Sequence, residues 1–430
     1  MSKLFISFLG TNRYIPCNYY FNDEKVNNVH YVQEALIQIF CKDFTENDRI
    51  LIFLTEKAKE KNWESNNNNE SLLKNRLTNL GLKSRIIDIL IPIGNSEKEI
   101  WDIFSIIYNN IKQNDEIILD VTHAFRSIPL LSIVLLNYAR FLKNIEVKGI
   151  YYGAFEVLGS RDEVKNMKIE KRDAPIFDLT SFDKLHQWSI AADNFVNYGS
   201  SKKLCNLIYE KINPILAENS KNEQAVYMNK FAKGLNKITG YFNTARGKQI
   251  VEGKDFIYLR NNISNLSEDF IVSKPLQPIK EKIKRQIELY NENNILNGFR
   301  AVKWCIDNEL IQQGITLLQE TIITYILVDL EIPYYNIKNR DIVSIAIKMI
   351  CEKKEYSQWP EKLKNDEDKT KKIINSDSFK LLAKAFDKLR EYRNDINHGG
   401  YLKTSRSAGA FSNKLLEVYR DVEKLIFKNE

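Results

Sequence analysis

An arginine and a histidine stand five positions apart near the end of the chain, in the segment RNDINH. On a straight helix Arg393 and His398 are offset by about 140° and by about 7.5 Å along the axis, so both can border one groove at the helix end. Histidine titrates near neutrality and can accept or donate a proton, and arginine binds phosphate oxygens at two points. Together these side chains can serve general acid-base cleavage of a phosphodiester.

A second group of polar residues follows an apolar run in the segment EIILDVTHAFRSIP, which covers 116–129. Asp120, Thr122, His123 and Arg126 supply a carboxylate, a hydroxyl, an imidazole and a guanidinium next to the start of a predicted helix. The free N–H groups and the positive dipole end of a helix N-terminus favour a phosphate. This turn is therefore a candidate site for an anionic ligand.

A third polar turn, FLGTNRYIPCNYYF, occupies 8–21. Its glycine, Gly10, permits close approach of a ligand to the backbone. The candidate donors to phosphate or to base edges are Thr11, Asn12 and Arg13, and the tyrosines that can stack on bases are Tyr14, Tyr19 and Tyr20. A further apolar run ends in YYGAFE, whose Gly153 and Ala154 can form the floor of the same crevice.

The elements that must position these turns are short apolar runs alternating with helical stretches. Uninterrupted runs rich in Ile, Val and Leu predict strands covered on both faces, at 4–9, 49–55, 84–92, 116–122 and 147–153. Apolar residues at the 3.6 period predict helices at 29–40, 98–113 and 128–143. This alternation predicts a doubly wound, mostly parallel sheet, with ligands at the carboxyl ends of its strands. A last strand at 175–182 closes the domain.

After about residue 183 no further apolar runs typical of strands occur, and the sequence pattern predicts helices. We expect a helical middle region over 183–293 and a second helical block over 294–430. Within that block, the predicted helix at 307–328 carries Glu320 and packs beside the predicted helix at 379–400. The latter ends at Gly399 and Gly400, the residue type expected just past a helix terminus.

Composition excludes several classes of function. The net charge of +7 is a mild excess, compatible with a polyanionic partner. Five cysteines without a CxxC or Cys/His spacing indicate neither a disulfide framework nor a zinc site. There is no GxGxxG and no GxxxxGK[ST] motif, which argues against a nicotinamide enzyme and a P-loop enzyme. No signal peptide and no membrane span is indicated, so a cytoplasmic protein is expected.

The polar turns at 116–129 and 8–21 resemble motifs of a known family. DVTHAFRS is similar to the D-x-T-H-G-F-R signature of a family of type III CRISPR accessory proteins, with Ala124 where the family often has Gly, and FLGTN with PCNYYF resembles that family's first-strand motif. The resemblance implies a Rossmann-like CARF domain over 1–182 that forms a homodimer and binds a cyclic oligoadenylate, with cyclic tetra-adenylate the expected activator. The residues implied in ligand binding are Gly10, Thr11, Asn12, Arg13, Asp120, Thr122, His123, Ala124, Phe125, Arg126 and Gly153.

The segment RNDINH resembles the R-x(4-6)-H motif of HEPN ribonucleases, including the polar residue after the arginine. The resemblance implies an all-α HEPN domain over 294–430 with Arg393, Asn394 and His398 as catalytic residues. One chain offers a single His and a single Arg, so a composite site in a homodimer or a higher even oligomer is expected to cut single-stranded RNA without a metal or a cofactor. The products would carry 2',3'-cyclic phosphate and 5'-hydroxyl ends.

Other interpretations remain open at this point. An Asp and a Thr after a strand are commonly a helix cap, and a His at a helix C-terminus commonly complements the dipole. The chain can be a non-catalytic sensor whose C-terminal domain only binds nucleic acid or a partner. It can also be a ring nuclease that degrades its own activator, with Thr11, Thr122 and His123 positioning the attacking 2'-hydroxyl.

Overall fold

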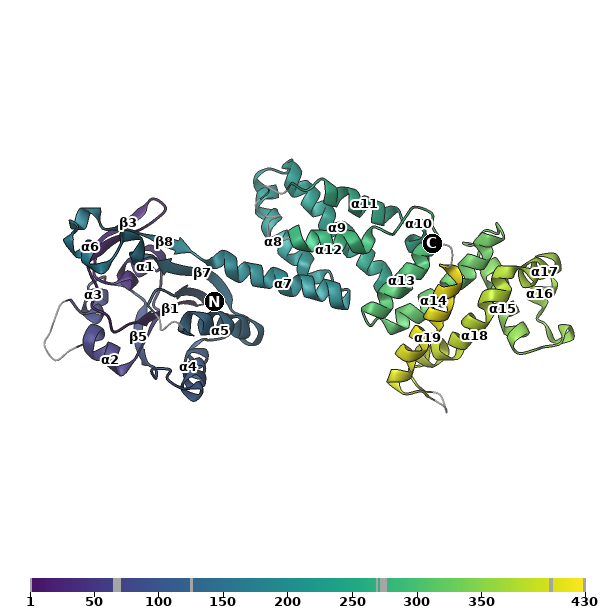
Figure 1. The fold of residues 1–430 in the computed structure, drawn as a ribbon, viewed down its shortest axis with the longest axis horizontal. Helices are drawn as coiled ribbons and strands as arrows, with labels where there is room; N and C mark the ends of the chain where they lie inside the picture. The colour runs from purple at the N-terminus through teal and green to yellow at the C-terminus, as the bar shows by residue number, and fades with distance from the viewer. Residues whose placement is uncertain are drawn as a thin grey trace. The chain divides into compact units, whose positions relative to one another are not determined.

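The computed structural model describes residues 2–64, 71–123, 127–267, 270, 277–401 and 405–427. The chain forms two compact units, Met1–His186 and Gln187–Glu430. The first unit contains the strands and the second is helical, which confirms the predicted fold class of an α/β domain followed by an all-α region (Figure 1). The predicted division near residue 293 stays a prediction, because helices on both sides of it share one hydrophobic core.

The described strands of the first unit form one eight-stranded sheet in the order β3-β2-β8-β7-β6-β1-β4-β5. β1 pairs in parallel with β4 on one side and with β6 on the other, β4 with β5, β6 with β7, and β2 with β8, while β2–β3 and β7–β8 are antiparallel. The strands are β1 (Lys3–Leu9), β2 (Cys17–Phe21), β3 (Glu24–Val29), β4 (Arg49–Leu54), β5 (Arg85–Leu90), β6 (Glu116–Asp120), β7 (Glu146–Gly153) and β8 (Asp173–Asp178).

Helices cover both faces of this sheet because β1 and β4 alternate their apolar side chains. Phe5 and Leu9 pack with α1 and α3, whereas Leu4, Ile6 and Phe8 pack with α4 and α5. The helices of this unit are α1 (Val32–Phe40), α2 (Glu56–Ala58), α3 (Leu73–Thr78), α4 (Glu97–Asn110), α5 (Ser127–Lys143) and α6 (Arg161–Asn166). This two-sided burial is the feature that uninterrupted apolar runs predict.

Two elements differ from the sequence-based expectation. The segment expected to be one polar turn at 8–21 contains β2, which pairs with β3 in a hairpin turning at Asn22 with φ 51°. The strand expected over 175–182 ends at Asp178. The Asp178 carboxylate accepts a hydrogen bond from the N–H of Thr180 at 2.8 Å, and Thr180 begins α7 (Thr180–Tyr198). The boundary between the two units falls within α7.

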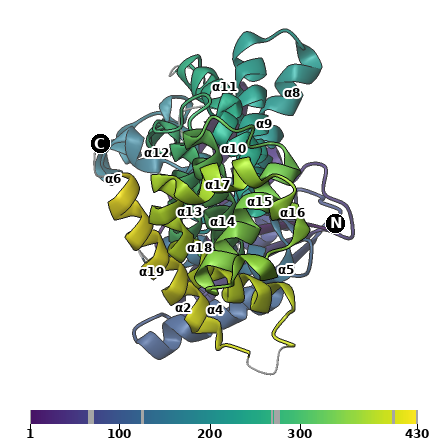
Figure 2. The same ribbon diagram turned by 90° about the vertical axis from the view of Figure 1, so that its right-hand side faces the viewer.

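The second unit is built around α14 (Ile311–Asp329), which packs against α13, α15, α18 and α19 (Figure 2). A helix that is apolar on nearly all sides is expected at the centre of a bundle. The predicted helix at 307–328 begins later than expected, because Glu309 adopts φ 58° between α13 and α14. The other helices of the unit are α8 (Lys202–Glu218), α9 (Glu223–Asn243), α10 (Gly247–Glu252), α11 (Lys254–Ser264), α12 (Gln277–Ile287), α13 (Leu296–Asp307), α15 (Ile337–Cys351), α16 (Glu361–Lys364), α17 (Glu367–Asn375), α18 (Asp377–Asn397) and α19 (Ala408–Ile426).

Candidate functional site

The carboxyl ends of β1, β4, β5 and β6 meet around one pocket of about 310 Å³ in the first unit. β4 and β5 lie on one side of β1 and β6 and β7 on the other, so the strand order reverses at β1, and open α/β sheets bind ligands in the crevice at such a point. The pocket is lined by Phe8, Leu9, Gly10, Thr11, Asn12, Tyr14, Phe53, Leu54, Thr55, Ile91, Thr122 and His123. Five of the predicted ligand-binding residues are therefore brought together: Gly10, Thr11, Asn12, Thr122 and His123.

The turn after β1 is held by its own tyrosine and by an asparagine from the π-helical turn Lys59–Trp63. The Gly10 N–H donates a hydrogen bond to the Tyr14 hydroxyl at 3.0 Å, and a Cβ on Gly10 would lie 2.9 Å from that oxygen. The Asn62 side-chain amide donates to the carbonyl oxygens of Gly10 at 2.8 Å and of Asn12 at 2.9 Å. Glycine at position 10 thus permits the close approach, and Asn62, which the sequence analysis missed, fixes the loop.

Asp120 does not line the pocket but anchors its polar wall. The side chain is fully buried and accepts hydrogen bonds from the Ser7 hydroxyl at 2.6 Å and from the Thr122 N–H at 2.8 Å. Burial raises the pKa of the Asp120 carboxyl, and these hydrogen bonds oppose the rise. Asp120 therefore ties the end of β6 to the neighbouring strand β1 and sets the position of Thr122.

Gly153 also acts behind the pocket wall rather than in it. Its N–H donates to the Thr122 hydroxyl at 2.9 Å, and a Cβ at this position would lie 2.3 Å from Cγ2 of Val32 and 3.0 Å from the Tyr19 ring. Tyr19 is 3% exposed in the core, so the expectation that it stacks on a ligand base is wrong. Tyr20, at 40% exposure, is outside the pocket lining.

His123 lies against Tyr14 at the polar side of the pocket, with ring centroids 4.6 Å apart. Its Nε2 atom is buried and has no hydrogen-bond partner among the residues that the structure describes. Burial lowers the pKa of His123 to about 4, so the imidazole is neutral at physiological pH. A neutral imidazole with an unsatisfied nitrogen suits a hydrogen bond to a ligand better than a charge-charge contact with phosphate.

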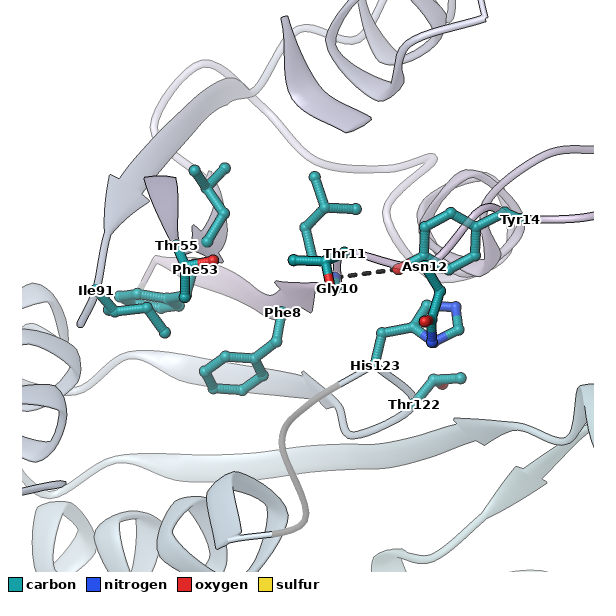
Figure 3. Close-up of a pocket in the computed structure, with 12 residues that line it drawn as sticks. Phe8, Gly10, Thr11, Asn12, Tyr14, Phe53, Thr55, Ile91, Thr122 and His123 are labelled. Carbon is teal, nitrogen blue, oxygen red and sulfur yellow. Dashed lines mark hydrogen bonds between the residues drawn. The ribbon is translucent and has the colours of Figure 1, made fainter. Parts of the chain in front are cut away.

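Figure 3 shows how the pocket is divided. Tyr14, His123 and Thr122 gather on one side, and Phe53 and Ile91 lie on the other with Thr55. Thr55 follows the end of β4 and caps α2, accepting a hydrogen bond from the Ala58 N–H at 3.3 Å. The pocket thus offers a polar side for hydrogen bonds and an apolar side for a planar ring.

Four predicted residues stand apart from this grouping. Arg13 is exposed and does not line the pocket, although its carbonyl oxygen accepts a hydrogen bond from the Arg161 guanidinium. Ala124, Phe125 and Arg126 lie outside the described residues. The assignment of ligand-binding roles to all four stays a prediction.

In the second unit, the predicted motif occupies the end of α18. The helix ends at Asn397, His398 follows with φ −93°, and Gly399 and Gly400 adopt φ 62° and 76°, which confirms the expected glycine terminus. Asn394 and His398 are exposed, and Arg393 is about one-third exposed. Asp395, which follows Asn394, is 1% exposed and accepts a hydrogen bond from the Arg406 N–H at 2.9 Å. This bond anchors the end of α18 to the segment before α19.

Glu320 of α14 lies between two arginines. Its Oε1 atom is 3.3 Å from Nη2 of Arg393, and its Oε2 atom is 2.6 Å from Nη2 of Arg340. Arg340 also donates to the Glu320 main-chain carbonyl at 2.9 Å and to the Thr324 hydroxyl at 2.9 Å. The predicted packing of Glu320 beside the motif is confirmed, and Arg340 is a further residue of this group that sequence reasoning missed.

The described residues form neither a metal-binding cluster nor a membrane-spanning helix. Within the described ranges no three His, Cys, Asp or Glu side chains are grouped so as to hold a metal ion. None of the helices in those ranges is both long and apolar enough to cross a membrane.

Comparison with known proteins connects the first unit to a family. Residues 4–156, about a third of the chain, match the family model described as the CARF domain of the CRISPR system endoribonuclease Csx1. The CRISPR-associated protein MJ1674 of Methanocaldococcus jannaschii is 28% identical over 277 residues, which are 63% of this chain and 38% of that relative. The predicted resemblance to CRISPR-associated CARF proteins is confirmed for the first unit.

Among solved structures, Enterococcus italicus Csm6 bound to cyclic hexa-2'-fluoro-hexa-dAMP aligns with 99% of this chain and 94% of that chain. The TM-score is 0.41 and the sequence identity is 12%.

Proposed function

We propose that the chain is an accessory ribonuclease of a type III CRISPR defence system, activated by a cyclic oligoadenylate and cutting single-stranded RNA, because residues 4–156 match the CARF domain of the CRISPR system endoribonuclease Csx1. The observation that carries the first half is the pocket at the strand ends of the CARF domain. Its apolar side suits an adenine ring, and its polar side offers His123, Thr122 and the turn after β1 to the ribose-phosphate backbone and base edges.

The second half rests on the end of α18. Arg393 and His398 stand at the end of α18, where His398 is exposed and Arg393 is about one-third exposed, and Glu320 supports Arg393. In this proposal a histidine takes the proton of the RNA 2'-hydroxyl as that oxygen attacks the adjacent phosphorus. The bond from phosphorus to the 5'-oxygen breaks, this oxygen receives a proton from the second histidine of a dimer, and the arginines stabilise the charge on the phosphorane.

A homodimer follows from this chemistry, because the reaction uses a proton acceptor and a proton donor and the chain has one motif histidine. A two-fold axis also places the same pocket residues on both halves of a symmetric cyclic ligand. The products would carry 2',3'-cyclic phosphate and 5'-hydroxyl ends, and the reaction would proceed without a metal ion.

The proposal is tested by incubating the full chain with fluorescent single-stranded RNA and cyclic tri-, tetra- or hexa-adenylate, in the presence of EDTA. We expect cleavage that depends on one ring size, with cyclic tetra-adenylate the expected activator. A strict requirement for Mg²⁺ or Mn²⁺ would contradict the metal-independent mechanism. Activator binding without any RNA cleavage would favour the alternative of a non-catalytic sensor.

A further inference from the structure

A second pocket, of about 420 Å³, opens in the second unit beside Arg393. α10, α14, α15, α18 and the segment between α14 and α15 contribute its walls. It is lined by Ala245, Gly247, Lys248, Val251, Thr316, Glu320, Thr321, Thr324, Tyr334, Tyr335, Arg340 and Arg393. The RNDINH motif thus contributes its arginine to this pocket, while His398 is outside the lining.

The ionised side chains lining the pocket favour an anion. Lys248, Arg340 and Arg393 are three cations, and Glu320 is one carboxylate, which leaves a surplus of two positive charges among the lining residues described. Arg340 is committed to Glu320 and Thr324, so it holds the acidic side chain in place. Lys248 lies 3.7 Å from Glu252 across one helical turn, and its side chain is 59% exposed. It therefore remains accessible to a ligand phosphate.

An aromatic surface stands beside these charges. The Tyr335 side chain is 71% exposed, and its ring meets that of Tyr334 edge to face, with centroids 5.9 Å apart. The main-chain carbonyl of Tyr334 accepts a hydrogen bond from Arg340 at 3.0 Å, which fixes this segment to the arginine. An exposed tyrosine on an anchored segment is a suitable platform for stacking of a nucleobase.

We propose that this pocket binds one nucleotide of single-stranded RNA next to the phosphodiester at Arg393, with the base stacked on Tyr335 and a backbone phosphate at Lys248. The inference rests on the proposed function, since it takes Arg393 to be part of the cleavage site. Ligand pockets have volumes of about 300–1,000 Å³, so the space suits a group of nucleotide size. Because the pocket shares Arg393 with the cleavage motif, the occupant is the RNA substrate rather than a free mononucleotide.

The two contacts can be separated by their response to salt. Stacking of a base on an aromatic ring is insensitive to ionic strength, whereas each phosphate contact to single-stranded nucleic acid contributes about 0.7 to the slope of log affinity against log salt. Affinity for a short fluorescent single-stranded RNA is measured by anisotropy at several NaCl concentrations. The parent protein is the full chain with His398→Ala, which prevents cleavage, and the assay is run with and without cyclic tetra-adenylate.

In this parent, Tyr335→Ala is expected to weaken RNA binding about 5- to 150-fold with the salt slope unchanged. Tyr335→Phe is expected to retain the parent affinity, because it keeps the aromatic ring. Lys248→Ala is expected to lower the salt slope by about 0.7. The matched controls are Tyr258→Ala, a tyrosine 46% exposed outside the pocket, and Lys203→Ala, an exposed lysine on α8, and both are expected to bind like the parent.

The inference is overturned if Tyr335→Ala binds RNA as Tyr258→Ala does, if Lys248→Ala leaves the slope unchanged, or if the parent binds no RNA in either condition. It is also overturned if AMP or UMP alone binds as tightly as the oligonucleotide. Cleavage by the unaltered chain is measured separately and decides the proposed function. If the unaltered chain cleaves RNA but Tyr335→Ala and Lys248→Ala bind RNA like the parent, the proposed function stands and only this inference is overturned.

Discussion

The carboxylate of Glu320 lies 3.3 Å from the guanidinium of Arg393, and it is the ion-pair partner that the described residues offer to that arginine. Glu320 is not free to follow Arg393, because Arg340 holds both its other carboxylate oxygen and its main-chain carbonyl. The Arg393 guanidinium is therefore steadied from α14, a helix at the centre of the bundle. Glu320 is thus a positioning residue for the proposed reaction.

Glu320→Gln is expected to lower kcat for RNA cleavage about tenfold without raising KM. The amide weakens a charge-assisted hydrogen bond worth roughly 1.5 kcal/mol, which loosens Arg393 in the transition state. It also removes the negative charge from the pocket, so affinity for RNA is not reduced. Steady-state kinetics measure kcat and KM separately, with Glu361→Gln at an exposed position on α16 as the control. An unchanged kcat would show that the pair only stabilises the fold.

Arg393→Ala and His398→Ala are each expected to abolish RNA cleavage while the affinity for cyclic tetra-adenylate stays near that of the unaltered chain. The two residues lie in the second unit and the ligand pocket lies in the first. Because His398 is exposed, its removal is expected to change the free energy of unfolding by less than about 0.5 kcal/mol. Gel assays of cleavage and calorimetry of ligand binding check both statements. His186→Ala, at another exposed histidine, is the control and should cleave normally.

Much of the fold follows from local sequence pattern. The predicted strands at 4–9 and 49–55 are β1 and β4, because residues such as Phe5 and Ile50 are buried on a sheet covered from both sides. The hairpin β2–β3 was not predicted, because β3 is largely exposed and polar in the segment EKVNNV. Its strand conformation depends on pairing with β2, a long-range contact that periodicity does not report.

The candidate sites were predicted less completely than the fold. The turn residues Thr11 and Thr122 could be found because both follow apolar runs whose ends meet at one edge of a parallel sheet. Asn62 and Arg340 could not, since each reaches its site from a helical segment without a motif of its own. Gly153 was placed in the crevice but acts through Thr122, a distinction that depends on which way the strand faces.

Gly153→Ala is expected to destabilise the chain by about 1–3 kcal/mol, because its Cβ would lie 2.3 Å from Val32 and 3.0 Å from Tyr19 in the core. Thermal denaturation checks the loss. Gly409→Ala is the matched control, since a Cβ there meets nothing within 4 Å, and as a residue of α19 it should be as stable as the unaltered chain or slightly more stable. Equal melting temperatures for the two variants would mean that the core beside β7 yields more readily than its packing indicates.

Arg126→Ala is expected to raise the activator concentration needed for RNA cleavage, with the rate at saturating activator largely intact. The residue lies outside the described part of the chain, so this prediction rests on the sequence, where it follows the DVTHAF turn. Loss of a charge-assisted hydrogen bond to phosphate costs roughly 1.5–3 kcal/mol, or about 10- to 100-fold in affinity for each half of a two-fold pocket. Titration of cyclic tetra-adenylate in the cleavage assay checks it, and an unchanged activator affinity would contradict the anion-binding role.

The lowered pKa of His123 gives the stability of the chain a defined pH dependence. Burial lowers its pKa to about 4 in the folded state, whereas an unfolded histidine has a pKa of about 6.5. Between these values the unfolded chain binds more protons than the folded one, so stability falls as the pH is lowered from about 6.5 to about 4 and the penalty is absent above about 6.5. At pH 5 the linkage amounts to at most about 2 kcal/mol.

His123→Gln removes this titration while keeping a polar side chain of similar reach. The unaltered chain is therefore expected to lose more thermal stability than the variant between pH 7.5 and pH 5, by several degrees in melting temperature. The raised pKa values of Tyr14 and Asp120, which face the same wall, are present in both proteins and cancel in the comparison. His186→Gln, at an exposed histidine, should follow the unaltered chain. Parallel loss of stability in the unaltered chain and in His123→Gln would mean that folding does not lower the pKa of His123.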